Sequence, residues 1–142
     1  MQTRRAFIDT EFDSFGGRLI SIAVVGDQGE EYYGVVTDTA VNPWVQENVI
    51  PKLEQEPIKL EELREQIVSF IIRSFPNCQL QVYANWPDDL AHFFSLLSEP
   101  NGVTRITNPV VGIFTRPPYN PTPDNPHNAL SDARALKEAF LG

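Results

Sequence analysis

Cysteine and histidine are nearly absent from this chain, which has one cysteine and two histidines in 142 residues. One cysteine cannot form an internal disulfide, and a Cys/His structural zinc site usually needs four nitrogen or sulfur ligands. Stability must therefore come from apolar burial, for which 42% of the residues are available. A chain of this length buries about two-thirds of its unfolded surface, so we expect a single domain over residues 1–142.

Long apolar runs are also missing. No run approaches the ~20 residues that span a bilayer. A signal peptide needs an uninterrupted apolar stretch, and Asp9 and Glu11 interrupt the one near the N-terminus. We therefore expect a cytoplasmic protein with no membrane partner.

Positive charge is scarce, because 11 lysines and arginines face 19 aspartates and glutamates, for a net charge of −8. Such a balance argues at first against nucleic acid, since phosphate binding usually requires a basic patch. Carboxylates that hold divalent cations reverse this argument locally, because the ions make the site neutral or positive.

The pattern of apolar residues and chain breakers predicts an α/β fold. Strands are expected at 4–12, 18–25, 31–37, 79–84 and 109–114, with Gly16-Gly17 as the first turn. Helices are expected at 43–50, 59–75, 87–98 and 128–141, and a Pro/Asn-rich loop at 116–126. Three antiparallel strands followed by αβ alternation predict a mixed sheet of about five strands with helices on both faces. This is the element order of the RNase H-like architecture.

Two carboxylates interrupt the first predicted strand, in the run FIDTEF. Asp9 and Glu11 are two residues apart, so they lie on the same face of the strand. Two unpaired carboxylates in a core strand are costly, and a cationic partner would offset that cost. The alternative is that this strand lies at a sheet edge with both groups in water.

A second group of polar residues opens the last predicted helix. His127 lies at the end of the loop, where a histidine is suited to act as a general base. Asn128 is placed to cap the helix, and Asp132 lies one turn into it. Alternatively, Asp132 is simply a first-turn carboxylate stabilised by the helix dipole.

A third group follows the strand at 79–84. Asn85 and Trp86 come directly after it, and Asp88 and Asp89 fall in the first turn of the next helix. Sites in α/β sheets gather at such strand ends, although first-turn carboxylates are also common for dipole reasons alone.

Together these motifs resemble the DEDDh family of 3′–5′ exonucleases, the RNase T-like branch of the RNase H-like superfamily. Residues 9–12 (DTEF) match its first motif and residues 127–132 (HNALSD) its third. The second motif places an aspartate four residues after an asparagine, which gives Asp89 after Asn85. Asp88 stands where that motif has a phenylalanine, so it remains an alternative to Asp89. The resemblance extends from about residue 5 to 140 and is strongest to a compact bacterial or phage exoribonuclease-like subgroup.

The resemblance implies hydrolysis of phosphodiesters with two Mg²⁺ or Mn²⁺ ions and His127 as general base. The implied metal ligands are Asp9, Glu11, Asp89 and Asp132, and Glu11 would also accept a hydrogen bond from the terminal 3′-OH. The implied partner is single-stranded RNA or a short oligonucleotide, cleaved to nucleoside 5′-monophosphates by a homodimer. Candidate substrate contacts are Thr10, Phe12, Asn85, Trp86 and Arg116. Alternatively, Trp86 is a core residue. Arg116, like Arg4, Arg5 and Arg18, is alternatively a solvated surface residue with no role in substrate binding.

Three other functions stay open at this point. Few cations leave room for a phosphodiesterase that acts on dinucleotides or other small nucleotides. The sugar preference is not fixed, so single-stranded DNA is an alternative substrate. A binding module without turnover would also have this fold, although the complete set of five motif residues argues against it.

Overall fold

The computed structural model describes residues 1–13, 17–36, 43–120 and 122–142, apart from the side chains of residues 45 and 46. The predicted turn at Gly16 and the predicted end of the third strand at residue 37 lie outside the described residues. Among the described helices, none combines the length and the apolar character needed to cross a membrane.

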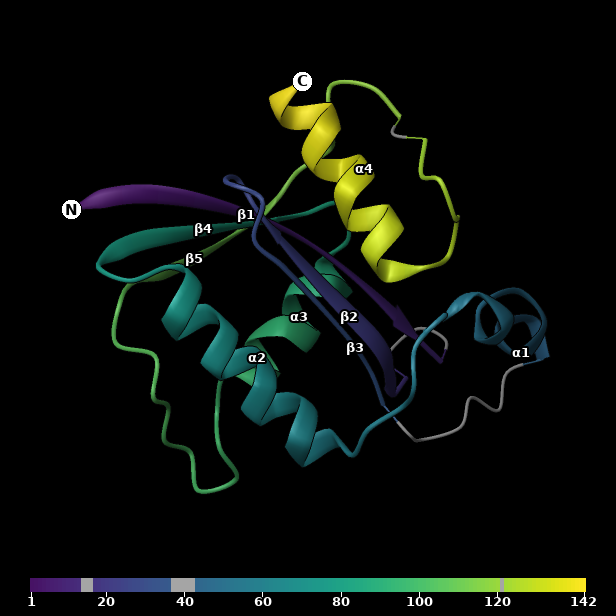
Figure 1. Cartoon of the computed structure of the whole chain (residues 1–142), viewed down its shortest axis with the longest axis horizontal. Helices are drawn as coiled ribbons and strands as arrows, with labels where there is room; N and C mark the ends of the chain where they lie inside the picture. The colour runs from purple at the N-terminus through teal and green to yellow at the C-terminus, as the bar shows by residue number, and fades with distance from the viewer. Residues whose placement is uncertain (14–16, 37–42, 121) are drawn as a thin grey trace.

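The described strands form one five-stranded mixed sheet (Figure 1). They are β1 (Gln2–Phe12), β2 (Leu19–Gly26), β3 (Glu31–Val35), β4 (Cys78–Ala84) and β5 (Val110–Phe114). The strand order is β3-β2-β1-β4-β5. β2 pairs antiparallel with β1 and β3, whereas β4 pairs parallel with β1 and β5. The predicted α/β fold, with three antiparallel strands followed by αβ alternation, is confirmed, and β1 lies at the centre of the sheet.

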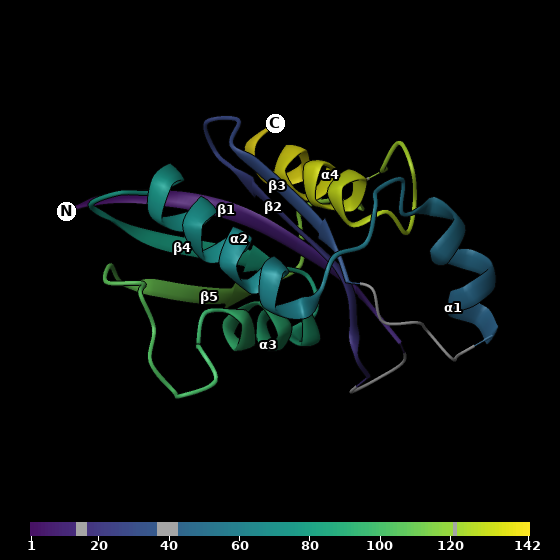
Figure 2. The same cartoon turned by 60° about the horizontal axis from the view of Figure 1, so that its bottom comes forward.

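Helices cover both faces of this sheet (Figure 2). They are α1 (Pro43–Asn48), α2 (Leu60–Ser74), α3 (Pro87–Leu96) and α4 (Ala129–Leu141), with a 3-10 turn at Ile50–Lys52. α2 and α3 pack on the face that carries Ala6 and Ile8. α4 packs on the opposite face, over Ala23 and Val25 of β2. The helix predicted over 43–50 is shorter, since α1 ends at Asn48 and residues 50–52 form a separate 3-10 turn.

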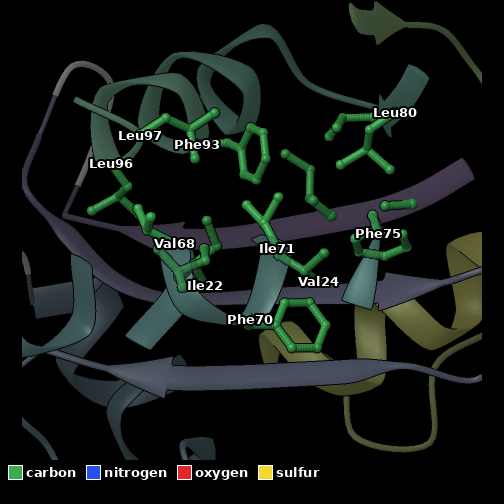
Figure 3. Close-up of a cluster of buried hydrophobic side chains, with 14 of the residues drawn as sticks. Ile22, Val24, Val68, Phe70, Ile71, Phe75, Leu80, Phe93, Leu96 and Leu97 are labelled. Carbon is green, nitrogen blue, oxygen red and sulfur yellow. The ribbon is translucent and has the colours of Figure 1, made fainter. Parts of the chain in front are cut away.

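The main core lies between the sheet and the helices α2 and α3 (Figure 3). Its residues include Ile22, Val24, Ile71, Phe75, Leu80 and Phe93. Two large apolar residues of these helices lie partly outside the core, since Leu60 is 40% exposed and Phe94 is 37% exposed. Leu60 is the first residue of α2, where the helix begins beyond the edge of the core. Cys78 is fully buried in this cluster.

Candidate functional site

The parallel strands β1, β4 and β5 end at the same edge of the sheet, and the three motif segments meet there. Asp9 and Glu11 lie in the last third of β1, on the face that packs against α4. Their register partners on β2 are Ala23 and Ser21. The alternative of a solvated edge strand is wrong, because β1 has a hydrogen-bonded neighbour on each side.

Three carboxylates converge at this edge. Oxygen atoms of Asp9, Glu11 and Asp132 all lie within 4.8 Å of one another. Asp132 reaches the cluster from the first turn of α4. This placement brings together, on one face of the sheet, side chains that are more than 120 positions apart in the sequence.

Burial and mutual repulsion make these carboxylates hard to ionise. Burial, followed by the charges of Asp89, Glu11 and Asp132, raises the pKa of Asp9 well above its usual value. Burial and the charge of Asp132 raise the pKa of Glu11 to about 8. Burial also raises the pKa of Asp132, against the opposing effects of a hydrogen bond with Glu11 and the charge of His127. A cation at this position would allow all three groups to ionise.

Asp89 joins the site from the start of α3 and is held there by Thr10. Both the backbone N–H and the hydroxyl of Thr10 donate to Oδ1 of Asp89, at 3.2 Å and 2.6 Å. Asp89 is only 1% exposed, and burial raises its pKa to about 6. Thr10 is itself 5% exposed, so its hydroxyl positions Asp89 from within the core. The neighbouring Asp88 is only partly buried.

Three of these carboxylates, Asp9, Glu11 and Asp132, could together hold a metal ion. Oδ2 of Asp9 and Oδ2 of Asp89 are buried and have no hydrogen-bond partner among the described residues. Buried ionised oxygens need a hydrogen bond or a cation, and a cluster of acids supplies no hydrogen to donate once it is ionised. Oxygen-only ligands are those that the hard cations Mg²⁺ and Mn²⁺ prefer.

His127 stands at the entrance to α4 on a tightly anchored turn. Its φ of 69° lies in the left-handed region, which is uncommon for a residue with a side chain. The next residue, Asn128, caps α4 as predicted, because its Oδ1 accepts from the backbone N–H of Ser131 at 3.1 Å. The Nδ2 of Asn128 donates to the carbonyl oxygens of Lys52 and Leu53, at 2.8 Å and 3.2 Å.

Two aromatic residues, Tyr33 and Trp44, lie next to this turn and were not among the predicted site residues. The hydroxyl of Tyr33 donates to the Leu53 carbonyl at 2.5 Å and accepts from Nδ2 of Asn128 at 3.3 Å. Burial, together with the charge of Glu11, raises the pKa of Tyr33. The ring of Trp44 meets the ring of His127 edge-on, with centroids 5.2 Å apart. The pairing of the strands could have placed Tyr33 near the site. Tyr33 of β3 pairs with Ala23 of β2, and Ala23 pairs with Asp9 of β1.

The remaining candidate residues lie around the same edge. Phe12 contacts the ring of His92, with centroids 5.3 Å apart. The core alternative for Trp86 is wrong, because 65% of this residue is exposed. Asn85 directly follows β4, and Arg116 lies beyond β5.

Arg4 does not belong to the site and is not solvated surface. It is 7% exposed, forms ion pairs with Asp27 and Glu30, and lies over the ring of Phe75. These contacts tie the turn after β2 to the core, so Arg4 is a structural residue.

Replacing Asn128 tests the anchoring of the His127 turn. We expect Asn128→Ala to lower the free energy of unfolding by about 2 kcal/mol, because it removes the helix cap at Ser131 and the side-chain bonds to the carbonyls of Lys52 and Leu53. Chemical denaturation measures this loss. Ser98→Ala, on the exposed residue after α3, is the control and should leave stability unchanged; equal stability of Asn128→Ala would contradict the anchoring role.

The fold and the acidic cluster define a class: an α/β protein whose carboxylates, gathered at the carboxyl ends of its parallel strands, could hold a metal ion. No family model matches the chain. The chain is similar to a protein named 3′-5′ exoribonuclease in Mycobacterium tuberculosis, found in strain CDC 1551 and in strain H37Rv. Identity with each is 33% over 155 aligned residues, covering 96% of this chain and 90% of the relative. The chain therefore belongs to this family of 3′-5′ exoribonucleases.

Proposed function

We propose that this protein is a DEDDh-type 3′–5′ exoribonuclease of the RNase T-like branch. It shortens single-stranded RNA or short oligonucleotides from the 3′ end and releases nucleoside 5′-monophosphates. The observation that carries this proposal is the convergence of Asp9, Glu11 and Asp132 within 4.8 Å, beside the buried Asp89. The similarity to named exoribonucleases supports it. The proposal extends to residues 1–142 as one exonuclease domain that acts as a homodimer, in keeping with the family resemblance.

Four carboxylates would hold two Mg²⁺ or Mn²⁺ ions: Asp9, Glu11, Asp89 and Asp132. When bound, such ions lower the pKa of the attacking water and stabilise the leaving 3′ oxygen. Asp9 and Asp89 each offer a buried oxygen that has no other partner in the described structure. Thr10 fixes the orientation of Asp89 before any ion binds, through its two hydrogen bonds.

His127 is the proposed general base. An imidazole nitrogen of His127 takes the proton from the attacking water. The backbone of Asn128 follows directly and is fixed by the side-chain bonds to Lys52 and Leu53. His127 is therefore held near the cluster, with its ring in edge contact with Trp44.

Contacts with the RNA strand come from residues at the same edge. Glu11 accepts a hydrogen bond from the terminal 3′-OH, which restricts cleavage to the end of the strand. Phe12 and the exposed Trp86 offer ring faces for bases, and such stacking is worth about 1–3 kcal/mol per base. Asn85 and Arg116 complete the set of polar contacts.

Initial rates on three substrates test the proposed function. An RNA 20-mer, a DNA 20-mer of the same sequence and a diribonucleotide are incubated with the protein and Mg²⁺ or Mn²⁺. We expect the RNA 20-mer to be cleaved, with nucleoside 5′-monophosphates as products. Exclusive cleavage of the dinucleotide would establish the small phosphodiesterase instead, and exclusive cleavage of DNA would reassign the substrate.

A pair of variants tests which aspartate of the second motif is the ligand. We expect Asp89→Asn to lower kcat by about 100-fold or more, because Asp89 contributes a buried, partnerless oxygen to the site. Asp88→Asn is the matched control on the same helical turn and should change kcat by less than about threefold. Steady-state kinetics measures both, and a reversed order of effects would assign the role to Asp88.

A further inference from the structure

A pocket on the other face of the sheet gathers positive charge in this acidic protein. It has a volume of about 510 Å³ and lies beside the start of β2 and between the helices α2 and α3. Arg18, Lys59 and Arg64 line it, together with one acidic residue, Glu61. Three of the 11 basic residues of the chain therefore share one cavity. Its volume is within the range of about 300–1,000 Å³ that is typical of ligand sites.

One buried donor at this pocket, in the side chain of Arg64, lacks an acceptor among the described residues. Nε of Arg64 is buried and has no hydrogen-bond partner in the described part of the chain. Lys59 is the N-cap residue of α2, and its ammonium group cannot accept a hydrogen bond from the first backbone amides of the helix. The first backbone amides of α2 therefore add their N–H groups and the positive end of the helix dipole to the same pocket. Arginine side chains and helix N-termini both favour phosphate oxygens as acceptors.

Phe12 is a neighbour of both the pocket residues and the carboxylate site. Leu19 and His92 both line the pocket. Leu19 is the register partner of Phe12, and the His92 ring contacts the Phe12 ring. Phe12 directly follows Glu11, and His92 lies one turn after Asp89 on α3. An RNA strand that stacks a base on Phe12 could therefore extend from the carboxylate cluster towards the pocket.

We propose that this pocket binds a phosphate of the RNA backbone, on the 5′ side of the nucleotide that is removed. This inference rests on the proposed exonuclease function. A chain with a net charge of −8 repels a polyanion as a whole, so a local group of cations is needed to hold the strand. The pocket would then make the affinity depend on RNA length, since a dinucleotide at the carboxylates is too short to fill both sites.

RNA binding by pocket variants tests this proposal. Fluorescence anisotropy of a 5′-fluorescein RNA 20-mer is measured with Mg²⁺ in an Asp9→Asn background, where the proposed turnover is stopped. We expect Arg64→Gln and Lys59→Gln each to raise the Kd about fivefold. The slope of log affinity against log salt should become shallower by about 0.7 for each phosphate that the variant no longer neutralises. Lys59 is exposed, so its replacement leaves the core intact.

Two further variants serve as controls. Arg73→Gln removes an exposed charge at the far end of the same helix and should leave the Kd unchanged. Glu61→Gln removes the acidic residue from the pocket and should lower the Kd, the opposite sign to Arg64→Gln. Equal effects of Arg64→Gln and Arg73→Gln would show a general charge effect and overturn the proposal.

The outcomes separate this proposal from the proposed function. If the wild-type protein cleaves RNA but the pocket variants bind the 20-mer normally, the pocket proposal fails and the exonuclease stands. If no RNA is cleaved, the anisotropy data still decide whether the pocket holds RNA. Inorganic phosphate is the second probe: if it raises the Tm of the wild type but not of Arg64→Gln, while RNA affinity is equal in both, the pocket takes free phosphate and the backbone assignment is overturned.

Discussion

Asp9→Asn should stop RNA cleavage and at the same time stabilise the metal-free protein. Asparagine keeps the shape of Asp9 but removes the charge that would hold a cation, so several kcal/mol of transition-state stabilisation are lost. At 1.36 kcal/mol for each factor of ten, we expect kcat to fall by at least about 1,000-fold. Steady-state cleavage of the RNA 20-mer measures the loss.

The stability gain follows from the raised pKa of Asp9 in the folded protein. The pKa of an aspartate in the unfolded chain is about 3.9. If folding raises that pKa, the folded state loses stability as the pH rises above about 3.9, because the unfolded chain ionises more easily. In EDTA, the Tm of Asp9→Asn should therefore exceed that of the wild type at pH 8, with a smaller difference at pH 5. Glu56→Gln, on an exposed connector, is the control and should show neither effect. A lower Tm with full activity would contradict the role of Asp9.

His127→Ala should lower kcat by about 100- to 10,000-fold, the usual contribution of a general base. Because His127 is not a proposed ligand, Mg²⁺ should raise the Tm of this variant as much as that of the wild type. Lost turnover with retained stabilisation by Mg²⁺ would distinguish His127 from the carboxylates. Replacing a carboxylate should remove both the turnover and the stabilisation by Mg²⁺. Differential scanning fluorimetry with and without Mg²⁺ measures the Tm shift that the metal causes.

His92→Ala is the matched control, since His92 is the other histidine of the chain and lies on α3 against Phe12. We expect a much smaller effect on kcat than that of His127→Ala. Turnover by His127→Ala within about threefold of the wild type would require another base.

The strands and the acidic motif could be predicted from local sequence. The alternation in residues 4–12 placed Asp9 and Glu11 on one face, and the structure brings both to Asp132. Asn128 was predicted to cap a helix because it directly precedes a stretch with helical spacing of apolar residues. The hydrogen bond from the Ser131 N–H to its side chain confirms this prediction. Such features depend on a few neighbouring residues, so local pattern is sufficient to find them.

Long-range contacts could not be predicted in this way. Nothing near Arg4 in the sequence indicates that Asp27 and Glu30 would bury it, because the antiparallel pairing of β1 and β2 brings them together. The bonds from Asn128 to Lys52 and Leu53 join segments about 75 residues apart. The sequence left open whether Trp86 is a core residue or a surface residue. Its exposed position beyond the end of β4 decides for the surface.

The most direct test of the central claim is a denaturing gel of a 5′-labelled RNA 20-mer incubated with the protein in Mg²⁺, in Mn²⁺ and in EDTA. We expect a ladder that shortens from the 3′ end with either metal and an intact band in EDTA. Full-length RNA in all three lanes, with the protein shown to be folded, would contradict the proposed metal-dependent exoribonuclease. Equal cleavage in EDTA would contradict the metal role of the carboxylate cluster.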